Sequence, residues 1–291
     1  HIHDRRQRQM CIRDRFSSFP LGRSHIPFLL IKSISLLLFL TYPPAATTNW
    51  KLEIKFSHSC EIIIGLLLTK TLYFCIMILD KEIAKQLAKS LLQINAIILQ
   101  PENPFTWASG WKSPIYCDNR RTLSFLEVRT FIRQNLARAI TTHFKGANLI
   151  AGVATGGIPH GVLVAEELGL PFIYVRSSNK SHGRQNKIEG YYNEGQSVIL
   201  IEDLISSGKS SLEAVEALKS KNLSIKGVAS IFNYGFPQSK ENFEKFECEY
   251  LSLCDYQILL EEAIKSNYIT KKDLPILEKW SENPSKWGNN V

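Results

Sequence analysis

The sequence predicts an α/β fold in which a mostly parallel sheet is flanked by helices. Short, continuous apolar runs alternate with helical segments between residues 149 and 232. Strands that are buried on both faces read as continuous apolar runs, so this pattern is typical of a parallel sheet covered by helices. Of the 291 residues, 44% are hydrophobic and 21% are charged. This composition supports a sizeable core and excludes a chain that is disordered throughout.

The individual elements follow from local patterns along the chain. A helix is expected over residues 80–99, where apolar side chains recur at steps of three or four: Ile83, Leu87, Leu91, Ile94 and Ile98. A loop rich in aromatic residues follows, and Ser124 is expected to open a second amphipathic helix. Strands are expected at 149–154, 171–175, 198–201 and 225–232, with helices at 161–168 and 210–218 between them. Helices at 257–265 and 271–280 complete the prediction.

Most of the basic excess lies in the first quarter of the chain. Residues 1–76 hold 10 Lys and Arg against 4 Asp and Glu, or +6 of the total +8, which leaves +2 for residues 77–291. The high isoelectric point therefore does not indicate nucleic-acid binding. We expect residues 1–76 to be a non-native or upstream-translated leader without an assigned fold, and residues 77–291 to form one domain. An organelle transit peptide and a membrane anchor are the alternatives, although Lys32 and Lys70 interrupt the two apolar stretches.

One strand end carries a pattern of residues suited to a sugar phosphate. The predicted strand 198–201 is followed directly by Glu202 and Asp203, and then by a turn of serines and a glycine ahead of a helix. Two carboxylates can accept hydrogen bonds from the vicinal hydroxyls of ribose. The backbone N–H groups of a small-residue turn at a helix N-terminus favour a phosphate. The pattern predicts a ribose 5-phosphate site at the carboxyl edge of the sheet.

Two other chemistries are excluded by spacing. The triplet Gly208-Lys209-Ser210 looks like the end of a Walker A loop, but that motif needs a glycine where Asp203 stands. No two cysteines have the C-x-x-C spacing of a zinc or redox site. We expect the three cysteines after residue 76 to be reduced thiols of a cytosolic protein.

The segment VILIEDLISSGKSS at 198–211 resembles the phosphoribosyl pyrophosphate (PRPP) signature of the type I phosphoribosyltransferases. Four further segments match that family in order: FTWASGWKSPIYCDNR (105–120), GVATGGIPHG (152–161), YVRSSNKSHGRQNKIEG (174–190) and VASIFNYGF (228–236). Over residues 77–291 the chain is similar to the orotate phosphoribosyltransferases. The resemblance implies the type I phosphoribosyltransferase fold, with a small hood built from the N-terminal part of the domain.

The resemblance also implies a reaction and a set of site residues. The reaction transfers the phosphoribosyl group from PRPP to orotate, giving orotidine 5′-monophosphate and pyrophosphate in de novo pyrimidine biosynthesis. Lys180, His182 and Asp203 are the expected catalytic residues, and Ser206 is expected to contact orotate opposite the 105–121 loop. The expected PRPP-binding residues are Arg176, Lys180, His182, Glu202, Asp203, Leu204, Ile205, Ser206, Ser207, Gly208, Lys209 and Ser210.

Residues 176–190 are basic and nearly free of apolar side chains, so we expect a mobile loop that neutralises pyrophosphate. In the family this loop closes over the partner subunit's site, which implies a cytoplasmic homodimer with shared active sites and no nucleic-acid or membrane partner. Mg²⁺ is expected to be carried by the pyrophosphate, without a protein carboxylate cage. The turn at residues 155–157 should let the backbone approach the pyrophosphate closely.

Some details stay open. Some family members carry lysines at Ala108 and Gly156 and an arginine near Tyr234, so the orotate carboxylate is expected to pair with Arg120 or Lys112 instead. A phosphoribosyltransferase for another base is one alternative function. A non-catalytic PRPP-binding regulator is the other, and it is disfavoured because Lys180 and His182 are present.

Overall fold

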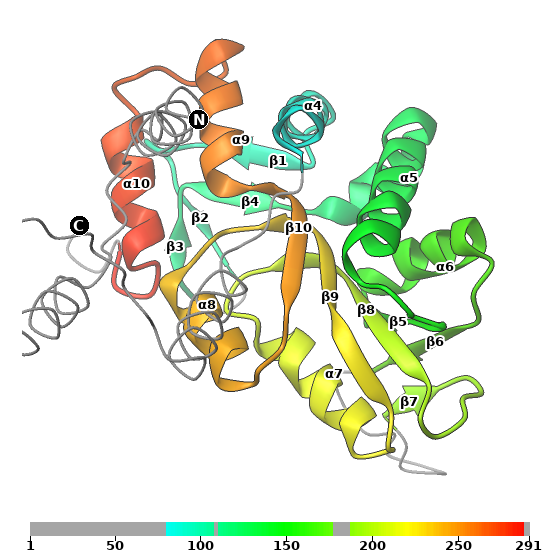
Figure 1. Ribbon diagram of the computed structural model, residues 1–291. Coiled ribbons are helices and arrows are strands. Elements are labelled where there is room, and N and C mark those ends of the chain that lie inside the picture. Colours follow the sequence, from blue (N-terminus) through cyan, green and yellow to red (C-terminus); the bar gives the residue numbers. More distant parts are fainter. Residues whose placement is uncertain (1–79, 108–109, 177–186, 288–291) are drawn as a thin grey trace, which may run out of the picture. The chain divides into compact units, whose positions relative to one another are not determined.

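The computed structural model describes residues 80–107, 110–176 and 187–287 (Figure 1). The chain divides into two units, residues 1–56 and 57–291, and every described residue belongs to the second. The expected leader, residues 1–76, lies outside the described part. Within the described ranges, no helix combines the length and the apolar character that a membrane span requires.

A six-stranded sheet forms the centre of the described domain, in the order β10-β9-β8-β5-β6-β7. Its strands are β5 (Leu149–Val153), β6 (Phe172–Val175), β7 (Ile188–Glu189), β8 (Ser197–Ile205), β9 (Ser224–Asn233) and β10 (Tyr250–Asp255). All neighbours pair in parallel except β7, which runs antiparallel to β6. This arrangement confirms the predicted α/β class. Strands β7 and β10 were not predicted.

Helices cover both faces of the sheet, as Figure 1 shows. One face is covered by α4 (Lys81–Gln93), α5 (Leu126–His143) and α6 (Gly157–Leu168), and the other by α7 (Lys209–Lys219) and α8 (Pro237–Lys245). The buried apolar side chains accordingly form two clusters, one for each face. Helix α9 (Tyr256–Lys265) packs against α4, and α10 (Leu274–Glu282) follows it.

The first two predicted helices have different bounds in the structure. Helix α4 ends at Gln93, because Asn95 adopts a left-handed conformation with φ +54° that interrupts the helix. The prediction that Ile98 lies on this helix was wrong, since residues 97–99 form a strand. Helix α5 begins at Leu126, after a 3-10 helix at Asn119–Ser124, so Ser124 does not cap it.

Two small antiparallel ribbons lie at the carboxyl edge of the sheet. Strand β1 (Ile97–Leu99) pairs with β4 (Ile115–Cys117), and β2 (Phe105–Thr106) pairs with β3 (Lys112–Ser113). The C-terminal helix also contributes here, because the fully buried Trp280 packs against Trp107 and Tyr234 at ring-centroid distances of 5.7 and 5.5 Å. These two ribbons, within residues 97–117, form the hood predicted from the N-terminal part of the domain, and α10 packs against it.

Candidate functional site

The acidic pair lies within strand β8. Pairing with β9 continues to Ile205, opposite Asn233, so the strand extends four residues beyond the apolar run that ends at Ile201. The prediction that Glu202 and Asp203 follow the strand was therefore wrong. The parallel ladder holds the main chain extended whatever the polarity of the side chains, which gives both acids a fixed backbone.

Glu202 is held from behind by the first turn of α7. Only 4% of the residue is exposed. Its Oε2 accepts hydrogen bonds from the hydroxyls of Ser211 (3.0 Å) and Ser210 (3.3 Å), and Oε1 accepts from the main-chain N–H of Asp203 (3.2 Å). Burial, and then the charge of Asp203, raise the pKa of Glu202 well above its usual value. The site therefore favours the protonated carboxyl of Glu202.

Asp203 is half-buried and faces the start of α6. A Cβ atom added to Gly156 would overlap the Asp203 carboxyl group, and one added to Gly157 would overlap the carbonyl oxygen of Ile201. The two glycines therefore allow the N-terminus of α6 to approach β8 closely. Asp203 thus lies directly beside the turn that was predicted to approach the pyrophosphate.

The turn that follows β8 has the geometry of an anion site. Residues Ser206–Gly208 lead into α7, and Gly208 has φ +77° and no side chain to cap that helix. The main-chain N–H of Lys209 donates to Ser207 Oγ (3.4 Å), and the other N–H groups at the start of the helix are available to acceptors such as phosphate oxygens. Helix α8 supports this turn, because the side-chain amide of Asn242 donates to the carbonyl oxygen of Ser207 (2.9 Å).

Sequence reasoning missed α8 because residues 237–245 are mostly polar. Pro237, in the first turn of the helix, is the signal that could have marked it.

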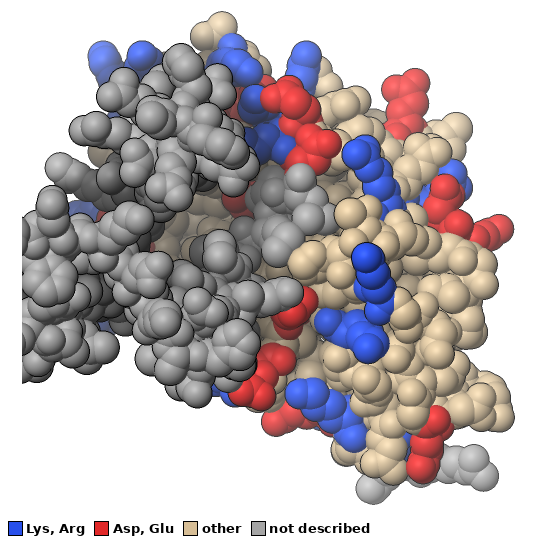
Figure 2. Space-filling view, viewed as in Figure 1, with Lys and Arg blue, Asp and Glu red and all other residues tan. Residues whose placement is uncertain are grey.

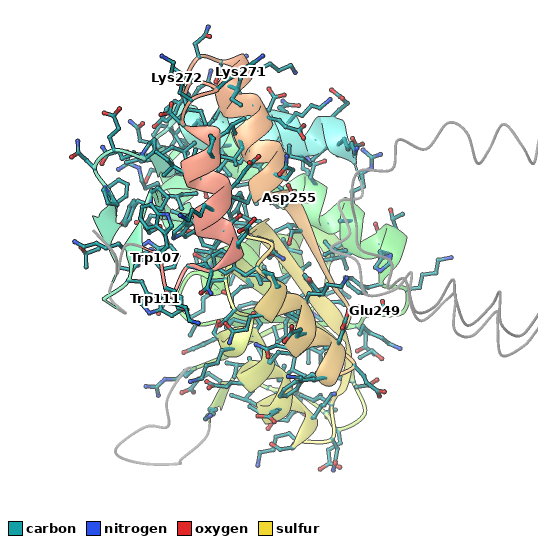
Figure 3. All side chains as sticks on the ribbon, turned by 90° about the vertical axis from the view of Figure 1, so that its left-hand side faces the viewer. Trp107, Trp111, Glu249, Asp255, Lys271 and Lys272 are labelled. Carbon is teal, nitrogen blue, oxygen red and sulfur yellow. The ribbon has the colours of Figure 1, made fainter. Side chains whose placement is uncertain are left out.

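A cleft of about 440 Å³ lies beside the same turn. Trp107 and Trp111 from the hood lie next to one another (Figure 3), and the main-chain N–H of Trp107 donates to the carbonyl oxygen of Trp111 (2.9 Å). Ser206 also lines this cleft. The structure therefore brings two tryptophans of the 105–121 loop together with the residue predicted to contact orotate. The remaining lining comes from residues 207, 236–238, 241 and 282–285. The contribution of 282–285 was not predicted, and we find no signal for it in the sequence.

Only some of the basic side chains that were predicted to bind the substrates lie within the described residues. The Arg176 guanidinium lies 3.6 Å from the Glu189 carboxylate, at the edge of segment 177–186. Lys180 and His182 fall within that segment, outside the described residues. Arg120 forms an ion pair with Asp118 (2.6 Å) and does not line the cleft.

Lys112 is likewise absent from the cleft lining, and its ammonium group donates to Thr106 Oγ1 (2.9 Å). The partner of the orotate carboxylate stays a prediction.

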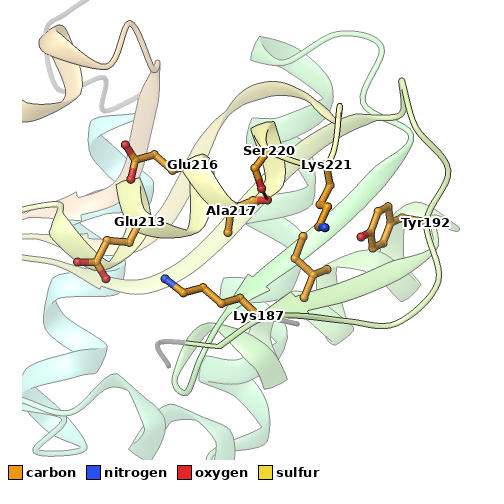
Figure 4. A pocket seen from close by; sticks show the side chains of 8 residues that line it. Lys187, Tyr192, Glu213, Glu216, Ala217, Ser220 and Lys221 are labelled. Atoms are coloured by element: carbon orange, nitrogen blue, oxygen red, sulfur yellow. Dashed lines mark hydrogen bonds between the residues drawn. The ribbon is translucent and has the colours of Figure 1, made fainter. Parts of the chain in front are cut away.

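Other features of the described surface are not part of this site. A second cavity of about 400 Å³ lies between β7 and α7, and half of its lining is charged: Lys187, Lys221, Glu213 and Glu216 (Figure 4). Figure 2 shows basic and acidic side chains interspersed on the visible described face, which is typical of a solvated surface. Within the described ranges, no cluster of three or more His, Cys, Asp or Glu side chains could hold a metal ion.

Comparisons with known proteins agree with this geometry. The phosphoribosyl transferase domain model matches residues 127–252. The orotate phosphoribosyltransferase of Porphyromonas gingivalis is 48% identical over 208 residues, which cover 72% of this chain and 99% of that protein. That of Listeria monocytogenes is 50% identical over 207 residues, covering 71% and 99%.

Solved structures show the same likeness. Orotate phosphoribosyltransferase from Aeropyrum pernix aligns with a TM-score of 0.56 at 26% identity, over 63% of this chain and 99% of that one. Leishmania donovani UMP synthase aligns with a TM-score of 0.59 at 26% identity, over 68% of this chain and 42% of that one. The fold and the signature turn thus coincide with extensive identity to named relatives, and the chain belongs to the orotate phosphoribosyltransferase family of phosphoribosyltransferases.

Proposed function

We propose that the chain transfers the 5-phosphoribosyl group of PRPP to orotate and releases pyrophosphate, as a step of pyrimidine biosynthesis. One observation carries the proposal. The cleft that contains Trp107, Trp111 and Ser206 adjoins the N-terminus of α7, and the acidic pair of β8 leads into the same turn. A nucleobase cleft, an accessible acid, Asp203, that can bind ribose, and a phosphate turn thus succeed one another along a single edge of the sheet.

The chemistry requires positioning and charge stabilisation. A bond forms between the orotate ring nitrogen, which gives up its proton, and C1 of the ribose, while the bond from C1 to the pyrophosphate oxygen breaks. Positive charge develops on the ribose and negative charge on the leaving pyrophosphate. Asp203 lies half-buried where the ribose hydroxyls are proposed to bind, and residues 206–210 hold the 5-phosphate. Arg176, Lys180 and His182 are proposed to neutralise the pyrophosphate.

The residues of this site fit a Mg²⁺ ion only when the ion arrives bound to the substrate. Glu202 is buried and engaged by two serine hydroxyls, so Asp203 is the carboxylate of the pair that remains accessible. Mg²⁺ commonly binds through one or two carboxylates together with substrate phosphates. The pyrophosphate oxygens would carry the ion, which would offset the charge of the leaving group, while Asp203 would bind the ribose hydroxyls.

We also propose that the enzyme acts as a cytoplasmic homodimer with shared active sites. The proposal rests on the resemblance of residues 176–190 to the family loop that closes over the partner subunit's site. Cys117, Cys248 and Cys254 are free thiols, as expected for a reducing compartment. Size-exclusion chromatography with light scattering tests the dimer, and a monomer that retains full turnover would contradict shared sites.

A base-competition assay tests the proposed substrate. Purified enzyme is given PRPP and Mg²⁺ with orotate, uracil, adenine or hypoxanthine, and pyrophosphate release is measured. Orotate should be turned over in preference to the others, whereas preferential turnover of any other base would refute the assignment.

The regulator alternative predicts PRPP binding without turnover. In the enzyme, Lys180→Ala should reduce turnover far more than it reduces PRPP affinity. Unchanged turnover in this variant would show that the loop has no catalytic part.

A further inference from the structure

A buried side chain in the segment that follows the hood connects to the acidic pair. Asn119, the first residue of the 3-10 helix, is fully buried. Its Nδ2 donates to the main-chain carbonyl oxygen of Asp203 at 2.6 Å, although the two residues are 84 positions apart. This hydrogen bond joins the segment that follows the hood to the strand that carries the acids.

The position of this bond follows from the way the sheet ends. Strand β8 pairs with β5 only as far as Ile201, whereas its pairing with β9 continues to Ile205. Asp203 therefore lies beyond the last β5 partner, and its N–H group bonds to the side chain of Glu202 instead of a strand. Main-chain carbonyl groups in such places need a partner. The Asn119 amide supplies one where the neighbouring strand has stopped.

Asn119 is itself anchored to helix α6. The hydroxyl of Thr122 donates to the main-chain carbonyl oxygen of Asn119 (2.6 Å) and lies 3.4 Å from Nε2 of His160. Thr122 and His160 are both buried. Helix α6 carries His160, and its N-cap residue Gly156 lies against the Asp203 carboxyl group. A series of buried polar contacts thus connects the 3-10 helix that follows the hood to β8 and to α6, next to Asp203.

A neutral His160 side chain fits the structural role of its contact with Thr122. Burial lowers its pKa, and the charge of Asp203 and the main-chain carbonyl of Asn119 only partly oppose this effect. Burial therefore favours the neutral ring, in which one nitrogen can donate and the other can accept.

We propose that Asn119 is a positioning residue that fixes Asp203 against the phosphate turn and keeps the hood in register with it. This inference rests on the proposed function, because it assigns Asp203 to the ribose of PRPP. A displacement of about 1 Å in a positioned group can lower turnover by about a hundredfold. Loss of the Asn119 amide should therefore lower kcat and raise the KM for PRPP.

The test compares two asparagines that bond to opposite ends of the same strand. Asn148 accepts a hydrogen bond through Oδ1 from the main-chain N–H of Ser197 (2.8 Å), at the start of β8. Asn119→Leu should lower kcat/KM for PRPP roughly 10- to 100-fold while the KM for orotate changes much less. Asn148 is exposed, so its Asn148→Leu variant is the control for loss of a strand-end hydrogen bond, and it should keep kcat/KM for PRPP within about twofold of the wild type, because it acts far from the acids.

Two further variants keep the test decisive. Asn119→Ala removes the amide without adding bulk, should the leucine variant not fold, and Thr122→Val keeps the amide but removes its anchor. Thr122→Val should have a smaller effect of the same kind. The proposal is overturned if folded Asn119 variants retain wild-type kcat/KM for PRPP, or if they lose no more than Asn148→Leu.

PRPP binding separates this proposal from the proposed function. Calorimetry with PRPP and Mg²⁺ gives the affinity of each variant without any nucleobase. If the wild type fails to turn over orotate, the proposed function fails, and the affinities still decide about Asn119. Weaker PRPP binding in Asn119→Leu than in Asn148→Leu supports positioning, and equal binding refutes it.

Discussion

Gly208 offers a direct test of how the phosphate turn is supported. The residue has φ +77°, and a Cβ atom placed there would lie 2.7 Å from Cε2 of Phe243. This is about 0.7 Å less than the 3.4 Å at which ordinary contact begins. The Phe243 ring is fully buried and stacks on Tyr250 with 4.2 Å between ring centroids, so it has little room to retreat. In Gly208→Ala the turn itself must move.

The expected loss of stability has two parts. An alanine in the left-handed region costs about 1–2 kcal/mol. Forcing a methyl group into a packed core adds roughly 1–3 kcal/mol. Gly195 is the matched control, because its φ is +79° and a Cβ atom there would meet nothing within 4 Å. Gly195→Ala should therefore lose only the first part, since the effect of alanine on the unfolded chain is common to both variants.

Urea denaturation and PRPP kinetics measure the two consequences. Gly208→Ala should unfold at a lower urea concentration than Gly195→Ala, and only Gly208→Ala should show a raised KM for PRPP. Adding Phe243→Leu to Gly208→Ala makes room for the methyl group and should restore part of the PRPP affinity. Equal stability losses in the two alanine variants, together with an unchanged KM for PRPP, would refute the reasoning.

Two further predictions concern the acidic pair and the hood. The folded-state pKa of Glu202 is raised, so its contribution to stability is full below its ordinary value of 4.5 and is lost as pH rises through the folded-state pKa. Glu202→Gln should therefore gain stability relative to the wild type as pH increases from about 4 to 8, measured as the melting temperature at each pH; a constant difference in melting temperature across this range would contradict the prediction. Trp280→Ala removes a fully buried ring that packs against Trp107, so it should lose about 3–5 kcal/mol of unfolding free energy and raise the KM for orotate. A stability loss without any change in that KM would show that α10 does not shape the cleft.

The parts of the fold that could be predicted are those whose signal is local. Strands β5, β6, β8 and β9 lie within the sheet, so their apolar runs are recognisable without tertiary information. Strand β10 was missed because Ser252 interrupts its apolar run. The structure pairs that hydroxyl with the Ser230 hydroxyl at 2.6 Å, which is how a polar residue is accommodated in a buried strand.

In the candidate site, too, only the residues that are contiguous in the sequence could be predicted. The acidic pair and the serine turn are contiguous, so the pattern at residues 202–210 was visible directly. Asn119 could not be assigned to the site, because only the folded chain brings it to Asp203. The strand end was also misplaced, since pairing with β9 and not side-chain polarity decides where β8 stops.

The proposed nucleobase cleft takes one wall from Trp107 and Trp111 and another from residues 282–285, at the end of α10. A base that fills the cleft contacts both walls at once, so its binding free energy also holds α10 in place. Amide hydrogen exchange in α10 should slow when orotate and PRPP are present together. Hydrogen exchange in α10 would then report whether the cleft is occupied, without any label on the substrate.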